Sequence, residues 1–167
     1  DFVTALAQSH VGKKSDLRYQ FSYLNDKDGE TIASPTAGFF ANTAGSYDVH
    51  DLEAYIAQNP SKTFIFWTTS LARSIGTKTA TDFNAQMRQY ASQHGKILID
   101  FADIESHTDT GVPCYDNVTT DGANYPAICQ DYTTETVGGH LGSVSAGKIL
   151  AGKAFWVAMA RIAGWNP

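Results

Sequence analysis

Apolar residues gather in short runs that alternate with segments of helical periodicity. Residues 63–68 (TFIFWT) and residues 96–101 (KILIDF) are mainly apolar and do not alternate with polar residues. Such runs are typical of parallel strands that helices cover on both faces. A third strand, rich in aromatic residues, is predicted at residues 19–24 and ends at the dense turn signal of residues 25–29.

Segments with helical spacing of apolar residues lie between and around these strands. The spacing predicts helices at about residues 2–11, 48–58, 79–94 and 143–163. Asp48 is the expected cap of the second helix, and Thr79 or Thr81 that of the third. Residues 103–139 are predicted to form a long irregular segment. The alternation of helices and strands indicates an α/β fold.

The length of the chain limits its domain organisation. A chain of 167 residues suits one domain, and we expect residues 1–167 to form a single α/β domain. Three strands make a thin sheet for such a domain, and a strand at residues 19–24 would leave an exposed edge. We therefore expect an earlier β-α segment to lie outside these residues, in the same polypeptide or in a separate chain.

Composition and charge exclude several classes of partner. With 43% hydrophobic and 17% charged residues, the chain has a folded, globular composition. Its net charge is -5 and it has no cluster of lysine and arginine, so neither nucleic acid nor an anionic membrane surface is an expected partner. We also expect no membrane span, because no apolar stretch approaches the required length.

Two cysteines, Cys114 and Cys129, lie in a polar and turn-rich region. They are too few for a zinc site by themselves. A disulfide between them is the favoured prediction, and two unpaired buried thiols are the alternative. Asn117 begins an N-glycosylation sequon between the two cysteines. Together these features favour an exported protein, either secreted or periplasmic.

The segment Gly138-Gly139-His140-Leu141 puts a histidine in a glycine-rich loop just before the last predicted helix. Glycines permit close approach of the backbone, and an imidazole can take up and return a proton near neutral pH. These are properties that a general base needs. A solvated loop residue or a helix cap is the alternative interpretation of His140.

A cluster of acidic residues with one histidine begins inside the strand predicted at residues 96–101. Its members are Asp100, Asp103, Glu105, His107 and Asp109. Carboxylates and an imidazole at such spacing can bind a divalent ion, but acidic residues also gather in loops because loops are exposed to water. Ordinary loop chemistry is the favoured interpretation, so we expect no metal and no cofactor.

Three stretches resemble the SGNH hydrolases, also called GDSL-type esterases and lipases. They are residues 97–107 (ILIDFADIESH), residues 138–141 (GGHL) and residues 151–156 (AGKAFW). The resemblance covers about residues 60–165. It implies a flavodoxin-like three-layer α/β/α sandwich with a parallel sheet, of which this chain lacks the first strand or strands. It also implies that His140, which precedes the last helix, is the catalytic histidine.

Residues 23–26 (YLND) resemble the family's third block, with tyrosine in place of its first glycine. In the family, the asparagine of this block helps to bind the oxyanion, so the resemblance assigns that role to Asn25. An Asn-Asp pair is also common in turns, and a plain turn is the alternative interpretation.

The family's nucleophile block, Gly-Asp-Ser or a variant of it, is not found in this chain. Ser46 precedes a predicted helix and Ser143 follows the candidate histidine, so neither has the position of the nucleophile. We therefore expect the nucleophilic serine outside this chain, on the missing N-terminal segment or on a second polypeptide.

The family's aspartate, three residues before the histidine, is replaced here by Val137. An apolar side chain cannot orient an imidazole. Glu135 is the candidate for this role, with Asp131 or a backbone carbonyl as alternatives. An exposed acidic loop residue is the other interpretation of Glu135.

These features favour a serine ester hydrolase of SGNH type that acts on a carboxylic ester, either a carbohydrate acetyl ester or a short acyl ester. This chain would supply the catalytic histidine. The alternative is a non-catalytic SGNH-like domain that binds carbohydrate or a protein partner. A structural domain in which the Gly-Gly-His-Leu segment is coincidental is the third possibility.

Overall fold

The computed structural model describes residues 39–40, 48–71, 73, 77–116, 122–136, 141–142 and 145–166. The helix and strand predicted before residue 25, together with Asn25 itself, lie outside the described residues. His140 and the sequon at Asn117 also lie outside them.

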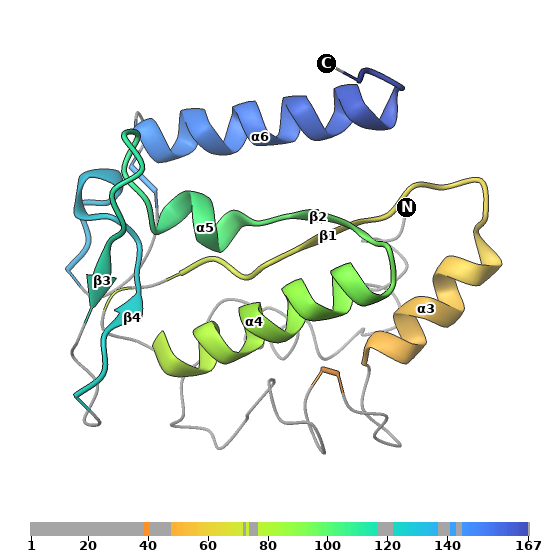
Figure 1. Ribbon diagram of the computed structural model, residues 1–167, viewed down its shortest axis with the longest axis horizontal. Coiled ribbons are helices and arrows are strands. Elements are labelled where there is room, and N and C mark those ends of the chain that lie inside the picture. Colours follow the sequence, from red (N-terminus) through yellow and green to blue (C-terminus); the bar gives the residue numbers. More distant parts are fainter. Residues whose placement is uncertain are drawn as a thin grey trace.

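A small parallel sheet lies at the centre of the described part of the chain. Strand β1 (Ile65–Trp67) pairs with strand β2 (Ile97–Ile99), and Ile65 lies opposite Ile97 in the register. Helix α4 (Thr77–Gln93) connects the two strands, as a parallel pair requires. In Figure 1, α4 lies on one side of the strands and α6 (Ala146–Ile162) lies on the other. The prediction of a mixed α/β fold is confirmed.

Helix α3 (Val49–Gln58) begins and ends where the sequence predicts. The side chain of Asp48 accepts a hydrogen bond from the backbone N–H of His50, and the side chain of Asp51 accepts one from the N–H of Asp48. This reciprocal capping satisfies backbone donors at the helix start, which explains why the helix begins there. Local sequence is therefore sufficient to define this helix.

Helix α4 begins earlier than predicted. Thr79 and Thr81 lie inside the helix, so neither is its cap. Ala80 is buried and extends the apolar face of Phe83 and Met87 by one turn toward the N-terminus. This face forms the core together with Phe66 and Tyr132, among other residues.

The segment predicted to be irregular between residues 103 and 139 contains short regular elements. They are helix α5 (Phe101–Glu105), the antiparallel strands β3 (Tyr115–Asp116) and β4 (Tyr125–Pro126), and the 3-10 turn η2 (Gln130–Tyr132). Strand β2 is also shorter than predicted, because the side chain of Asp100 accepts a hydrogen bond from the N–H of Asp103 and starts α5. Two-residue strands leave no periodicity that a sequence pattern can reveal.

The disulfide between Cys114 and Cys129 is confirmed. It joins the residue before β3 to the residue before η2, across 15 positions of sequence. A loop of about this size contributes roughly 3 kcal/mol in the chain-entropy model. The backbone N–H of Cys129 also donates to the carbonyl oxygen of Glu105 at 2.9 Å, so the bridged segment is held against the end of α5.

Helix α6 begins at Ala146, three residues later than predicted, because the hydroxyl of Ser145 accepts a hydrogen bond from the N–H of Lys148 at 3.2 Å. Its first turn packs on the ring of Tyr132, which is buried. Among the described helices, none has the length and apolar character needed to cross a membrane.

Two glycines of α6 allow this packing to be tested. A Cβ atom added to Gly147 would lie 2.7 Å from Cδ2 of Tyr132, whereas one added to Gly152 would meet no heavy atom within 4 Å. Gly147→Ala is expected to lower the free energy of unfolding by about 1–3 kcal/mol through overpacking. Gly152→Ala is expected to raise it by about 0.5–1 kcal/mol through helix propensity. Urea unfolding of both variants measures the difference, and equal effects would contradict the close contact.

Candidate functional site

The carboxyl ends of β1 and β2 lie at the same edge of the sheet, because the two strands are parallel. Thr68, Thr69 and Ser70 follow β1, and Asp100 follows β2. Ligands of open α/β sheets bind outside the carboxyl ends of the strands. A functional site is therefore expected at these residues.

Asp100 is held in a structural network at this edge. Arg88 of α4 contacts both of its carboxylate oxygens, at 2.6 and 2.8 Å, and the hydroxyl of Thr68 donates to one of them at 3.0 Å. Burial raises the pKa of Asp100, but the hydrogen bonds and charge of Arg88 outweigh it, so the pKa lies below its ordinary value. Asp100 thus joins β1, β2 and α4 at the edge.

Thr69 is held by a buried amide. The backbone N–H of Thr69 donates to the side-chain oxygen of Asn84 at 2.7 Å, and the amide nitrogen of Asn84 donates to the Thr69 carbonyl at 3.4 Å. Asn84 lies on α4 and is almost completely buried. This pair of hydrogen bonds fixes the path of the backbone directly before Ser70.

Glu105 is the most unusual charged residue at this edge. Its side chain is buried, with the residue only 1% exposed, and it accepts hydrogen bonds from the Leu71 N–H at 2.6 Å and from the Ser70 hydroxyl. The Ser70 oxygen lies 3.0 Å from each carboxylate oxygen. Burial raises the pKa of Glu105 to about 7, although the hydrogen bonds from Leu71 and Ser70 act in the opposite direction. A carboxyl group with such a pKa is a candidate functional group.

The acidic cluster does not converge on one point. Asp100 pairs with Arg88, Glu105 turns into the protein interior, and Nδ1 of His107 lies 2.8 Å from the backbone oxygen of Asp103. The chain forms α5 here rather than continuing the strand, which separates the side chains that strand alternation would have placed together. In the described ranges, no three histidine, cysteine or acidic side chains are grouped so that they could hold a metal ion.

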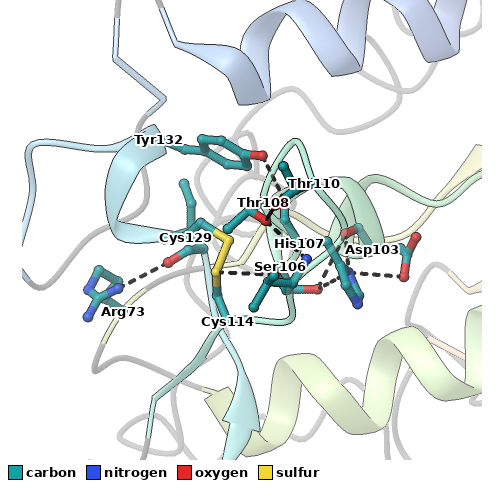
Figure 2. The surroundings of a disulfide bond; sticks show 11 residues. Arg73, Asp103, Ser106, His107, Thr108, Thr110, Cys114, Cys129 and Tyr132 are labelled. Carbon is teal, nitrogen blue, oxygen red and sulfur yellow. Dashed lines mark hydrogen bonds and ion pairs between the residues drawn. A yellow bond between two sulfur atoms is a disulfide. The ribbon is translucent and has the colours of Figure 1, made fainter.

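The two ends of the loop that contains His140 are attached near the same region. The N–H of Gly142 donates to the carbonyl oxygen of Tyr132 at 2.8 Å, and Leu141 packs against the core. The hydroxyl of Tyr132 in turn donates to the carbonyl oxygen of His107 at 2.7 Å, a contact drawn beside the disulfide in Figure 2. The segments that flank the loop are thus tied to the chain that follows α5.

The other predicted site residues have different outcomes. Glu135 is half-buried, and its backbone N–H donates to the hydroxyl of Thr133 at 3.1 Å. Asp131 lies exposed in η2. Asn25 lies outside the described residues, as do His140 and Val137, so the orientation of His140 by Glu135 stays a prediction. Ser46 and Ser143 lie outside them as well.

Ser70 and Glu105 form a pair that the sequence did not single out. The sequence pattern groups Glu105 with the acidic cluster, and nothing in the local pattern distinguishes Ser70. One signal was available, because Ala102 and Glu105 lie three residues apart and so share one face of a short helix. That face is buried, which gives Glu105 an exceptional environment.

A groove of about 640 Å³ lies between β2 and α6. Ile97 and Ile99 contribute apolar surface, and Asp103, Lys153 and Arg161 contribute charged groups. Neither Ser70 nor Glu105 lines this groove. The groove and the Ser70–Glu105 pair are therefore separate features of the described structure.

No protein-family model, curated protein or solved structure matches this chain.

Proposed function

We propose that this protein is a serine ester hydrolase of SGNH type that acts on a carboxylic ester, either a carbohydrate acetyl ester or a short acyl ester. The observation that carries the proposal is the link between the residues that flank the His140 loop and the segment after α5. The N–H of Gly142 donates to the carbonyl oxygen of Tyr132, and the hydroxyl of Tyr132 donates to the carbonyl oxygen of His107. That segment follows the carboxyl end of β2, the edge at which α/β proteins bind ligands. The parallel pair of strands, with a helix on either side, is compatible with a flavodoxin-like three-layer sandwich.

In the proposed reaction, His140 takes the proton of a serine hydroxyl while the serine oxygen bonds to the acyl carbon. The Asn25 side chain helps to hold the oxyanion of the tetrahedral intermediate. His140 then returns the proton to the departing alcohol oxygen, and water releases the acyl group by the reverse sequence. Glu135 orients the imidazole, and the serine is expected on a segment outside this chain or on a second polypeptide.

The proposed location is outside the cytoplasm, either secreted or periplasmic. The disulfide between Cys114 and Cys129 supports this location, because disulfides persist in oxidising compartments. The sequon at Asn117 is compatible with export.

A fluorophosphonate probe for activated serines tests the proposal directly. The native protein is treated with the probe, and intact masses are measured under reducing conditions. We expect one adduct, on a segment outside residues 1–167 or on a second polypeptide that copurifies with the protein, together with hydrolysis of p-nitrophenyl acetate or acetylated xylan. An adduct within residues 1–167 would contradict the expected location of the nucleophile. Folded protein that gives neither an adduct nor hydrolysis would contradict the proposal and favour a non-catalytic binding domain.

A further inference from the structure

Among the described residues, Ser70 is the one exposed residue whose side chain contacts the Glu105 carboxylate. Ser70 is exposed, whereas Glu105 is 1% exposed and Leu71, its other partner, is also buried. The Ser70 oxygen lies 3.0 Å from both carboxylate oxygens. A ligand at this edge would therefore meet the serine hydroxyl with a carboxyl group directly behind it.

A buried carboxylate without a cation is costly to the fold, so its presence calls for a role. Within the described residues, no lysine, arginine or histidine forms an ion pair with Glu105. Arg73 donates to the carbonyl oxygen of Ile128 at 3.1 Å, and Nδ1 of His107 lies 2.8 Å from the carbonyl oxygen of Asp103. Since an unpaired buried charge destabilises a protein, a neutral amide side chain would accept the Leu71 N–H at a lower cost to the fold.

The carboxyl group determines which way the serine hydroxyl points. When Glu105 is ionised, Ser70 donates its proton inward and presents oxygen lone pairs to the solvent. When Glu105 is neutral, it can donate to the Ser70 oxygen, and the serine proton is then free to point outward. Both forms are present near neutral pH, because the pKa of Glu105 is about 7.

A hydroxyl group is the ligand group that suits both arrangements. It donates to the serine lone pairs in the first case and accepts the serine proton in the second. A carbonyl group only accepts and an ammonium group only donates, so each suits one arrangement. Two hydrogen bonds in series, from the ligand hydroxyl to Ser70 and from Ser70 to the Glu105 carboxylate, also strengthen each other. The second bond is charge-assisted when the carboxylate is ionised.

We propose that Ser70, with Glu105 as its positioning residue, is a recognition site for a free hydroxyl group of the ligand. The substrate class that follows is a carbohydrate or other polyol ester rather than a simple alkyl ester. This substrate assignment rests on the proposed ester hydrolase function, whereas the recognition of a hydroxyl group does not.

Binding is measured by NMR titration of the full chain with xylobiose, cellobiose, chitobiose and sorbitol. Tetrahydropyran, a sugar-sized ring without hydroxyl groups, is the control ligand. We expect at least one polyol, but not tetrahydropyran, to shift the amide resonances of Ser70 and Leu71. Ser70→Ala should weaken that binding about tenfold, as loss of one charge-assisted hydrogen bond does. Ser61→Ala, a matched change of a serine exposed in the turn before β1, should leave binding unchanged.

Glu105→Gln keeps the size of the side chain and an acceptor for the Leu71 N–H, but it removes the carboxylate behind Ser70. We expect it to weaken polyol binding as well. The recognition site is overturned if none of the four polyols binds, or if Ser70→Ala binds them as tightly as the native protein does. Because Ser70 is exposed, Ser70→Ala is expected to fold. It therefore tests the recognition site even if Glu105→Gln does not fold.

Hydrolysis separates this proposal from the proposed function. The rates for a xylobiose monoacetate and for p-nitrophenyl acetate are compared in the native protein and in Ser70→Ala. We expect kcat/KM to fall about tenfold for the sugar ester and to stay within about twofold for the aryl ester. Equal effects on both esters would overturn the recognition site alone. Polyol binding through Ser70 without any ester hydrolysis would overturn the proposed function alone.

Discussion

Replacing His140 by alanine is expected to lower kcat for ester hydrolysis by about 100-fold to 10,000-fold, the usual contribution of a general acid-base group. The imidazole moves the proton in both halves of the proposed reaction, so its loss slows acylation and deacylation alike. The free energy of unfolding should change little, because the replaced side chain is polar and is preceded by two glycines in the sequence. Steady-state kinetics with p-nitrophenyl acetate and thermal unfolding measure the two effects.

His50→Ala is the matched control for this prediction. His50 lies on α3, and its side chain is 53% exposed. Within the described residues, the polar contact of its ring is with the carboxylate of Asp48, at 3.2 Å. Its replacement should leave kcat within about twofold of the native value, as expected for a surface change away from the site. An active protein whose turnover survives the loss of His140 would contradict the assignment of the base.

Glu105→Gln is expected to remove a pH dependence from the stability of the folded protein. Burial raises the pKa of the Glu105 carboxyl group to about 7, compared with an ordinary value of 4.5. The folded protein thus holds this proton more tightly than the unfolded chain does. The stabilisation is fully present below the ordinary value of 4.5 and is lost as the pH rises through 7. This pKa difference corresponds to roughly 3 kcal/mol.

Urea unfolding of the native protein and of Glu105→Gln between pH 4.5 and pH 8.5 measures this effect. The variant should gain stability relative to the native protein as the pH rises, by up to about 3 kcal/mol. Every other ionisable group is shared by both proteins, so its contribution cancels in the difference. Asp109→Asn, a change of an exposed acid nearby, should show a constant difference from the native protein. A constant difference for Glu105→Gln as well would contradict a buried carboxyl group with a raised pKa.

Local sequence was sufficient for the elements that local contacts define. Helix α3 begins directly after its cap, Asp48, as predicted, because the capping residues Asp48 and Asp51 are three positions apart. The apolar run at residues 63–68 contains β1, and the spacing of Phe83 and Met87 identifies the buried face of α4. The disulfide was also predicted, since two cysteines in one turn-rich region have few other uses.

Local sequence was not sufficient where a side chain changes the path of the backbone. The run at residues 96–101 predicts a longer strand than β2, which ends when Asp100 caps α5. Strands β3 and β4 are too short to show alternation, and they are paired near a disulfide that joins residues distant in sequence. The prediction of an irregular segment was therefore wrong for these elements.

The sequence by itself determined the mixed α/β character, the main helices and the apolar strands, because hydrophobic periodicity and capping depend on residues that are close in the sequence. It also determined the pairing of the two cysteines, because two cysteines allow only one disulfide. Only the tertiary structure decided that Glu105 is buried behind Ser70, 35 positions away in the sequence. The same glutamate on a solvated loop would have an ordinary pKa and no particular partner. Parallel pairing of β1 with β2 brings the two segments to one edge, and the low polarity of the interior changes the chemistry of the carboxyl group that lies there.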